Sequence, residues 1–368
     1  MNTKVFHISP ENTAGVPYNV MAMQNKFGMA ARLLTFYKIP FNFHEDICLD
    51  LPIPRSKLAM KWREFKQSNL HKKIKEQNLD SLTHLPYFKP ANSVELAYMK
   101  RREKRNEGKL LRALNEMKAD TFDIIHFGSG IDYYSDSRLA KKWKKAGKKI
   151  INCYYGDDLR TRGIVKDMDE LSDLNLTFEY DHTLRHQNVN FLYFPFDADN
   201  VKYTDDESYN SGKKIRIIHS PTHRFIKGTE FVIAAIDKVK KSKNNIEFIL
   251  IENQPREKVI EVKTTCHIAI DQIGNRGGTG YGINSLETLA MGLPTITDMN
   301  GGMETWLPDN PFIVASSNNL AEKIIETIDN IKNIALERHK LRKWVIKYHS
   351  YESVFKKLLE YYKNYKII

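Results

Sequence analysis

The chain has 368 residues, of which 41% are hydrophobic and 28% charged, a balance typical of folded globular proteins that excludes a disordered one. The length suits two domains. No apolar run approaches the roughly 20 residues of a membrane span, and the first residues are too polar for a secretory signal. The three cysteines, Cys48, Cys153 and Cys266, are far apart. They argue against a disulfide framework or a zinc ribbon, so we expect a protein of the reducing cytoplasm.

The first half of the chain alternates between strand-like and helix-like segments, which predicts an α/β domain. We expect strands at Lys4–Ser9, Phe122–Phe127 and Lys149–Tyr155, a loop at Gly15-Val16-Pro17 and a helix at Tyr18–Leu34. Between the first strand and the later two lies Arg55–Lys118, which is mostly helical in pattern and strongly basic.

The positive charge of the chain is concentrated in one segment. Arg55–Lys149 contains 24 Lys and Arg against 11 Asp and Glu, which accounts for the whole net charge of +12. A local field of this kind attracts an anionic partner, either a membrane surface or an acidic acceptor, although solvated helix faces would explain the same charge. Trp143 stands among Lys141, Lys142, Lys144 and Lys145, a combination suited to a lipid headgroup region.

A polar stretch, Asp197–Lys213, separates the two halves and predicts a linker. After it, strands and helices alternate at lengths typical of a parallel sheet with right-handed crossovers. We expect strands at Ile215–His219, Ile246–Ile251, His267–Asp271 and Pro294–Asp298, and helices at Lys227–Lys241, Gln254–Val262, Ile283–Met291 and Tyr351–Tyr365. Two such domains would leave between them a cleft of the kind in which small molecules bind.

The most informative segment is Asp271–Pro294, in which a glycine-rich loop joins a strand to a helix. Gly278, Gly280 and Gly282 lack side chains, so main-chain N–H groups can approach a phosphate there, and the helix N-terminus adds partial positive charge. Glu287 lies one turn into the helix, where its carboxylate can accept hydrogen bonds from two ribose hydroxyls. A generic tight turn is the alternative explanation of these glycines.

This segment resembles the donor site of retaining GT-B glycosyltransferases, especially glycosyltransferase family 4. The family has a glycine-aromatic-glycine, a Glu-Ala-Met-Ala-like run and a Gly-x-Pro. They stand here as Gly280-Tyr281-Gly282, Glu287–Met291 and Gly292-Leu293-Pro294. Thr279 replaces the first glutamate of the family's Glu-x7-Glu motif, so no carboxylate is expected to contact the donor sugar from that position.

Further stretches agree with the family in the expected order. Arg224 and Lys227-Gly228 resemble its Arg…Lys-Gly element, whose two cations would neutralise the departing diphosphate. Gly301-Gly302 resembles its Gly-Gly loop on the donor side. In the first half, the resemblance adds His126 to the catalytic residues and places Gly15, Asp157, Asp158 and Arg160 on the acceptor side.

Two of these assignments leave alternatives open. His126 ends a buried strand, where a lone histidine is as often a core residue, and the family's cleft histidine could instead correspond to Gly128. Asp157 and Asp158 could hold an acceptor hydroxyl or simply cap a helix.

The resemblance implies an α/β GT-B fold, with two Rossmann-like, doubly wound parallel-sheet domains facing a central cleft. We expect an acceptor-side domain at 1–200 with a basic helical insertion at 55–118, a nucleotide-sugar domain at 201–345, and a C-terminal helix at 346–368 that packs back on the first domain. The implied reaction is retaining transfer of a sugar from a UDP- or GDP-sugar, without a metal or other cofactor. The implied acceptor is a glycan or a lipid-linked glycan of the bacterial cell envelope.

Two alternatives remain. One is another enzyme of the same fold, a sugar-nucleotide epimerase or a phosphorylase. The other is a nucleic-acid-binding protein that uses the basic segment. No nucleic-acid module is recognisable, so we expect no nucleic-acid partner. We expect a cytoplasmic enzyme in peripheral contact with the anionic inner face of the membrane.

Overall fold

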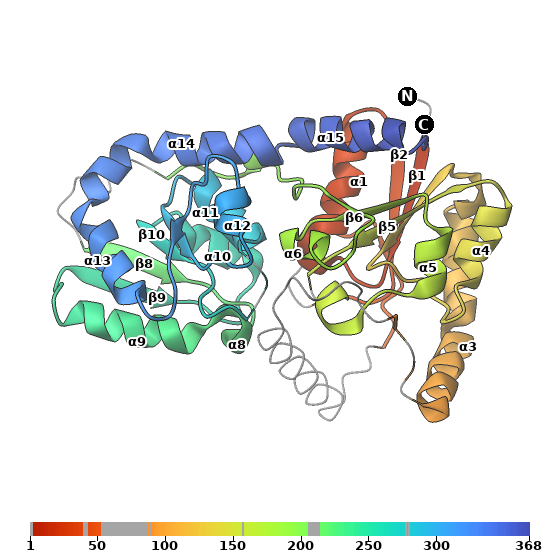
Figure 1. Ribbon diagram of the computed structural model, residues 1–368, viewed down its shortest axis with the longest axis horizontal. Coiled ribbons are helices and arrows are strands. Elements are labelled where there is room, and N and C mark those ends of the chain that lie inside the picture. Colours follow the sequence, from red (N-terminus) through yellow and green to blue (C-terminus); the bar gives the residue numbers. More distant parts are fainter. Residues whose placement is uncertain are drawn as a thin grey trace. The chain divides into compact units, whose positions relative to one another are not determined.

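The computed structural model describes residues 3–39, 43–52, 87–88, 90, 92–156, 158–204, 214–276, 278 and 280–368 (Figure 1). The chain forms two units. Unit 1 is Met1–Pro195 together with Val354–Ile368, and unit 2 is Phe196–Ser353. Each unit has its own parallel sheet, which confirms the predicted α/β construction. Much of the predicted basic insertion, residues 53–86, and residues 205–213 of the predicted linker lie outside the described residues.

The described residues of unit 1 form a sheet of seven parallel strands: β1 (Lys4–Ser9), β2 (Ala30–Thr35), β3 (Ile47–Cys48), β4 (Ile124–Gly128), β5 (Lys149–Tyr154), β6 (Leu174–Thr177) and β7 (Val189–Phe191). Their order in the sheet is β3-β2-β1-β4-β5-β6-β7. The helices are α1 (Val16–Lys26), α3 (Ser93–Glu116), α4 (Arg138–Lys145), α5 (Lys166–Leu171), α6 (Tyr180–Thr183) and, from Val354 onward, α15 (Tyr351–Asn364).

Helices cover both faces of this sheet. Successive side chains of a strand point to opposite faces, and those of β1 show what lies on each. Phe6 packs edge-on against Trp143 of α4, with 6.1 Å between ring centroids. His7 bonds to Gln24 of α1. Since both faces are covered, the strand has no solvated side, and this explains its apolar sequence.

The helix predicted at Tyr18–Leu34 is wrong in its second half. α1 ends at Lys26, and residues Ala30–Thr35 form β2, which pairs in parallel with β1 from Lys4 to Ser9. Gly28, with φ of +84°, turns the chain between the two elements. Only tertiary pairing with β1 distinguishes this short apolar run from a continuing helix.

A chain of buried polar contacts connects α15 to the sheet of unit 1. His7 Nε2 lies 2.6 Å from Gln24 Oε1, and Gln24 Nε2 donates to the Tyr362 hydroxyl at 3.0 Å. The same hydroxyl lies 2.6 Å from His126 Nε2, while His126 Nδ1 lies 3.3 Å from Cys153 Sγ. Because a buried polar group without a partner is costly, this chain favours one position of α15 on the sheet.

We predict that unit 1 loses stability as the pH falls below about 6.5. Burial lowers the pKa of His7 to about 4, and burial and the neighbouring His7 lower the pKa of His126 well below its usual value. The unfolded chain therefore binds more protons than the folded chain between pH 6.5 and 4. The stabilisation is complete above pH 6.5 and is lost as the pH falls, by up to about 1.4 kcal/mol per pH unit for each histidine.

One buried carboxyl acts in the opposite direction. Burial raises the pKa of Asp132 to about 6. The contribution of Asp132 to the stability of the folded state therefore grows as the pH falls from 6 to 4, and it offsets part of the stability that the histidines lose. Urea denaturation followed by circular dichroism at pH 7, 6 and 5 measures the balance. A midpoint that is constant over this range would contradict the prediction, and His7→Gln should flatten the pH dependence.

In the part of unit 2 that the structure describes, the sheet has five parallel strands: β8 (Ile215–His219), β9 (Ile246–Leu250), β10 (Ile268–Ile270), β11 (Thr295–Thr297) and β12 (Ile313–Val314). Their order is β12-β11-β10-β8-β9. The helices are α8 (Arg224–Lys227), α9 (Thr229–Lys240), α10 (Arg256–Lys263), α11 (Ile283–Ala290), α12 (Met303–Trp306), α13 (Leu320–Asp329) and α14 (Ile331–His349). The strands and helices predicted for this half are confirmed, except that the first predicted helix begins at Thr229, as α9, and Gly228 separates it from the short helix α8.

Two arginines of α14 hold the C-terminal end of α11. Arg338 is fully buried and donates to the carbonyls of Gly292 at 2.7 Å and of Thr204 at 3.1 Å. Arg342 donates to the carbonyl of Ala290 at 2.8 Å. The last carbonyls of a helix lack partners within the helix, and guanidinium groups suit the negative end of its dipole. These contacts hold the C-terminal end of α11, whereas the glycine-rich loop precedes its N-terminus.

No helix among the described residues combines the length and the apolar character needed to cross a membrane.

Candidate functional site

The sheet of unit 2 reverses its direction of winding between β8 and β10. β8 comes first in the chain, β9 lies on one side of it, and β10 lies on the other. The two loops that leave the carboxyl ends of β8 and β10 therefore diverge to opposite faces of the sheet. In open α/β sheets, ligands bind in the crevice that this divergence opens. The predicted Arg…Lys-Gly segment follows β8, and the glycine-rich loop follows β10.

Asp271, directly after β10, joins these two loops. Its Oδ1 accepts from Lys227 Nζ at 2.6 Å and from Asn284 Nδ2 at 3.0 Å, and its Oδ2 accepts from Ser285 Oγ at 2.5 Å. Burial alone would raise the pKa of Asp271, but the Lys227 ammonium and the two neutral donors hold that pKa at about 2. The ionised carboxylate thus fixes Lys227 beside the first turn of α11.

Gly228 lets the loop after β8 approach the loop after β10. Its φ is +66°, and a Cβ at this position would lie 1.8 Å from the carbonyl oxygen of Ile273. The main-chain N–H of Ile273 also donates to the carbonyl of Lys227 at 3.2 Å. A backbone oxygen cannot move aside as a flexible side chain can, so only glycine fits here. Gly228 therefore sets the position of Lys227.

The N-terminus of α11 is open. Gly282 precedes the helix, no side chain among the described residues caps it, and a Cβ built on Gly282 would have no atom within 4 Å. Free N–H groups and the helix dipole at such an end favour an anion. Gly280 packs beside Met303, the residue that follows the predicted Gly301-Gly302 loop. The three predicted glycine segments of unit 2 thus lie near one edge of its sheet; Thr279 lies outside the described residues.

Tyr281 does not present its side chain as a ligand contact. The ring is buried, stacks on Phe312 at 4.9 Å between centroids, and its hydroxyl lies 3.0 Å from His349 Nε2. Any contact of this residue with a donor would therefore come from its main chain. The aromatic of the glycine-aromatic-glycine motif anchors the loop to the core.

Glu287 is buried with both carboxylate oxygens in ion pairs. Arg256 donates to Oε1 at 2.9 Å, and Lys263 donates to Oε2 at 2.5 Å. The Arg256 side chain is 40% exposed, whereas that of Lys263 is 1% exposed. A ribose hydroxyl would share this carboxylate with two cations. The sequence offered no signal for these partners, which come from α10.

Arg224 is directed toward two other carboxylates. Its guanidinium donates to Glu230 Oε1 at 2.7 Å and to Glu252 Oε2 at 2.6 Å, and its side chain is 43% exposed. A phosphate would have to compete with both glutamates for this residue. Lys227 is better placed, because an ammonium has three donors and its contacts are Asp271 at 2.6 Å and Gln272 at 3.4 Å.

The predicted residues of unit 1 mainly make structural contacts. Both ring nitrogens of His126 have protein partners in the interior, which favours the core role. Arg160 is 3% exposed and pairs with Asp181 and Glu179. Asp158 Oδ2 accepts from the main-chain N–H of Tyr155 at 2.8 Å, as a capping side chain does.

The contacts of the two remaining predicted acceptor-side residues give no evidence for an acceptor site. Gly15, with φ of +74°, directly precedes α1. Asp157 lies outside the described residues.

The predicted role of Trp143 at a lipid surface is wrong. Its ring is 1% exposed, and its indole N–H donates to Asp120 at 2.7 Å. Lys141, Lys142 and Lys144 are paired with Asp167, Asp120 and Asp173, respectively. Because α4 is helical, Trp143 points into the core while the neighbouring lysines point to solvent. Residues that are adjacent in the sequence therefore lie on opposite faces of the helix.

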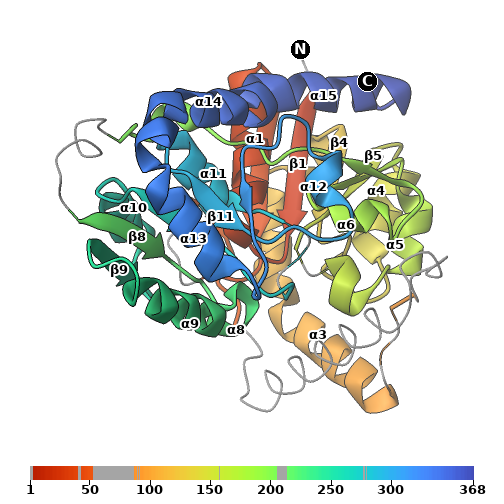
Figure 2. The same ribbon diagram turned by 60° about the vertical axis from the view of Figure 1, so that its left-hand side comes forward.

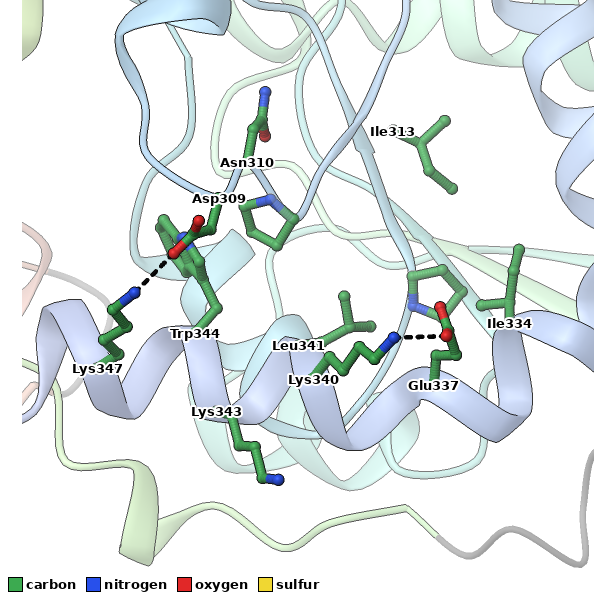
Figure 3. Close-up of a pocket in the computed structure, with 12 residues that line it drawn as sticks. Asp309, Asn310, Ile313, Ile334, Glu337, Lys340, Leu341, Lys343, Trp344 and Lys347 are labelled. Atoms are coloured by element: carbon green, nitrogen blue, oxygen red, sulfur yellow. Dashed lines mark hydrogen bonds and ion pairs between the residues drawn. The ribbon is translucent and has the colours of Figure 1, made fainter.

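A cavity of about 530 Å³ in unit 2 lies apart from the carboxyl edge of the sheet (Figure 3). It adjoins Pro294, which precedes β11, and is therefore at the amino end of that strand. Its apolar walls come mainly from Pro311, Ile313, Leu341 and Trp344, and the Asp309–Lys347 ion pair lies beside it. None of the predicted site residues lines this cavity.

In the described parts of the chain, no three His, Cys, Asp or Glu side chains are grouped so as to hold a metal ion.

Two Rossmann-like parallel-sheet units, the second with its switch point between β8 and β10, make up the GT-B fold. No protein-family model and no curated protein matches the chain. Several solved structures match the chain. An alpha-glucosyltransferase in complex with UDP and DNA matches with a TM-score of 0.60 at 10% identity, over 98% of this chain and 99% of that one. TarM from S. aureus, with Fondaparinux, alpha-GlcNAc-glycerol and UDP, matches with a TM-score of 0.59 at 11% identity, over 97% and 99%.

The third neighbour is described as an enzyme of another type. A putative UDP-N-acetylglucosamine 2-epimerase from Listeria monocytogenes matches with a TM-score of 0.55 at 9% identity, over 100% of this chain and 98% of that one. At identities this low the likeness establishes the GT-B fold, and the site must supply the rest of the argument.

Proposed function

We propose that this protein is a glycosyltransferase whose second unit binds a nucleotide-sugar donor. The observation that carries the proposal is the arrangement at the switch point between β8 and β10, where the ionised Asp271 holds Lys227 beside the open N-terminus of α11. A cation and a helix N-terminus at one point suit a diphosphate. Two GT-B neighbours, the alpha-glucosyltransferase and TarM, are each in complex with UDP, which supports a UDP-sugar.

The chemistry of the proposed reaction is the departure of the nucleotide diphosphate from the sugar. Lys227, with Arg224 if its pairs with Glu230 and Glu252 open, would stabilise the charge that develops on this leaving group. Glu287 would hold the ribose. By resemblance to family 4 we propose transfer with retention, in which the leaving diphosphate takes the acceptor proton on the same face of the sugar. Such a reaction needs no carboxylate nucleophile and, we propose, no metal.

We propose a glycan or lipid-linked acceptor, with a role in cell-envelope synthesis. The basic segment supports an anionic acceptor or membrane contact, but Trp143 contributes to neither because it is buried.

UDP should stabilise the protein against heat much more than uridine does, because the proposed site recognises the diphosphate. At a concentration 100 times its dissociation constant, UDP should add about 2.7 kcal/mol of stability. Differential scanning fluorimetry with UDP, GDP, ADP, dTDP and uridine, each with and without EDTA, measures this. Equal shifts with UDP and uridine would place the phosphates outside the site, and a UDP shift abolished by EDTA would contradict metal-free binding.

An epimerase is the second candidate, because a GT-B neighbour is described as one. Incubation with the UDP-sugar alone distinguishes the two functions. An epimerase converts the sugar without a second substrate, whereas a glycosyltransferase leaves it unchanged or slowly hydrolyses it.

A further inference from the structure

Among the described elements of unit 1, α3 is the longest helix, and its first turns extend beyond the other labelled elements of the unit in both views (Figure 1 and Figure 2). Six cations of this helix are exposed: Lys100, Arg101, Lys104, Arg105, Lys109 and Arg112. We call them the basic face of α3. At 1.5 Å per residue they span about 18 Å. None of the six forms an ion pair with a described residue.

The acidic residues of α3 do not neutralise this face. Glu103 is buried and accepts from the main-chain N–H of Ser135 at 2.8 Å, and Glu107 accepts from the Tyr134 hydroxyl at 2.8 Å. Both glutamates thus face the body of the unit. The other two, Glu95 and Glu116, lie at the ends of the helix. The two central glutamates of α3 therefore face the unit, and its exposed charges are positive. Solubility alone is achieved with exposed charges of both signs and does not require this separation.

The basic face differs in this respect from α4. There, Lys141, Lys142 and Lys144 each have an aspartate partner. On α3, like charges stand four residues apart, as in Lys100 with Lys104 and Arg101 with Arg105, and such pairs weaken a helix. Binding of an anion would relieve this repulsion. A groove of about 550 Å³ lies beside the C-terminal end of α3. Lys118 and Arg138 line it together with Asp120, and Arg138 is paired with Asp136.

The apolar residues of α3 indicate which anion fits. Leu110, Ala113 and Leu114 are buried in the core of unit 1. The exposed ones, Val94 and Leu111, lie near opposite ends of the basic face. A helix that enters a lipid surface needs a continuous apolar stripe, which this face lacks. Tyr98 is the one exposed aromatic ring on the described helix, too little for base stacking of the kind that holds single-stranded nucleic acid.

We infer that the basic face of α3 docks an anionic glycan chain, a linear polysaccharide with acidic groups along it. This inference deepens the proposed function by assigning the class of acceptor polymer, and it rests on that function only for the acceptor role. The six cations form no ion pair with a described residue and span about three helical turns, so a polymer can contact several of them at once.

Fluorescence anisotropy with labelled dextran sulfate tests the inference, with neutral dextran of the same size as the control ligand. The wild type should bind dextran sulfate, lose affinity steeply as salt rises, and ignore neutral dextran. The triple variant Arg101→Gln, Arg105→Gln and Arg112→Gln should bind about 100-fold more weakly, at about a fivefold loss for each cation.

The matched control is the triple variant Lys141→Gln, Lys142→Gln and Lys144→Gln, which removes as many charges from paired positions and should bind almost as the wild type does. Equal weakening of both variants, or no preference over neutral dextran, would overturn the inference. Tighter binding to oligo-dT would indicate a nucleic acid instead, and preference for anionic vesicles a membrane. The thermal shift with UDP should be the same in both variants. If UDP does not bind while dextran sulfate does, the proposed function fails and the docking surface stands.

Discussion

Replacing Lys227 by Met should lower the stability of unit 2 by about 3 kcal/mol at pH 7, because Asp271 would be left buried without its counter-charge. The Asp271 side chain is fully buried, and its two remaining donors, Asn284 and Ser285, are neutral. Adding Asp271→Asn should restore most of the loss, because the amide carries no charge. Urea denaturation of the two single variants and the double variant gives the coupling energy between the residues.

The pH dependence of the Lys227 variant provides an independent check. In the wild type the pKa of Asp271 is about 2, below that of an unfolded aspartate, so its stabilisation is present above about pH 4 and is lost as the pH falls toward 2. Without Lys227 the folded pKa should rise above the unfolded one. The variant should then gain stability relative to the wild type as the pH is lowered. Lys238→Met, at an exposed position of α9, is the control and should change stability by less than about 0.5 kcal/mol.

Glu287→Gln should destabilise unit 2 by about 3 kcal/mol in addition to weakening nucleotide binding. The sequence suggested only a residue that holds the ribose. The structure instead places the buried Lys263 ammonium against its carboxylate. Without Glu287 that ammonium has no counter-charge, which is the costly way to break a buried ion pair. Urea denaturation, together with calorimetry of UDP binding, separates the two effects.

Two further variants identify the cause. Glu287→Gln combined with Lys263→Met should recover stability, since neither charge is then buried, but should not recover UDP affinity if Glu287 holds the ribose. Arg256→Gln should cost less than about 1 kcal/mol, because its partly exposed guanidinium can be replaced by water. A stable Glu287→Gln single variant would show that Lys263 finds another partner or loses its proton. Unchanged UDP affinity would remove Glu287 from the proposed site.

Local pattern was enough to predict most of unit 2 and the glycine-rich loop. β8, β10, α11 and β11 were predicted within a few residues, because each is a short apolar run bounded by glycine, proline or polar residues. Gly228 was identified from its neighbours, and the structure supplies the reason, its contact with the carbonyl of Ile273. The resemblance that led to the GT-B fold is carried by the same local motifs.

Tertiary structure decided which side chains form ion pairs and which are buried. Spacing along the chain does not show that Lys227 meets Asp271, 44 residues away, or that Glu287 meets Lys263, 24 residues away. The order of the strands brings these residues to the same edge of one sheet or places their helices side by side.

Tertiary structure also decided which side chains are buried. The sequence around Trp143 suited a lipid surface, and that around His126 suited a reacting base, yet both rings lie inside unit 1 because the faces of β4 and α4 on which they stand are packed. The sequence by itself therefore determined the order of elements and the residues that a diphosphate site needs, since these depend on neighbours within a turn or a strand. Which cations are paired and which are free depends on long-range packing, and only the folded chain decides it.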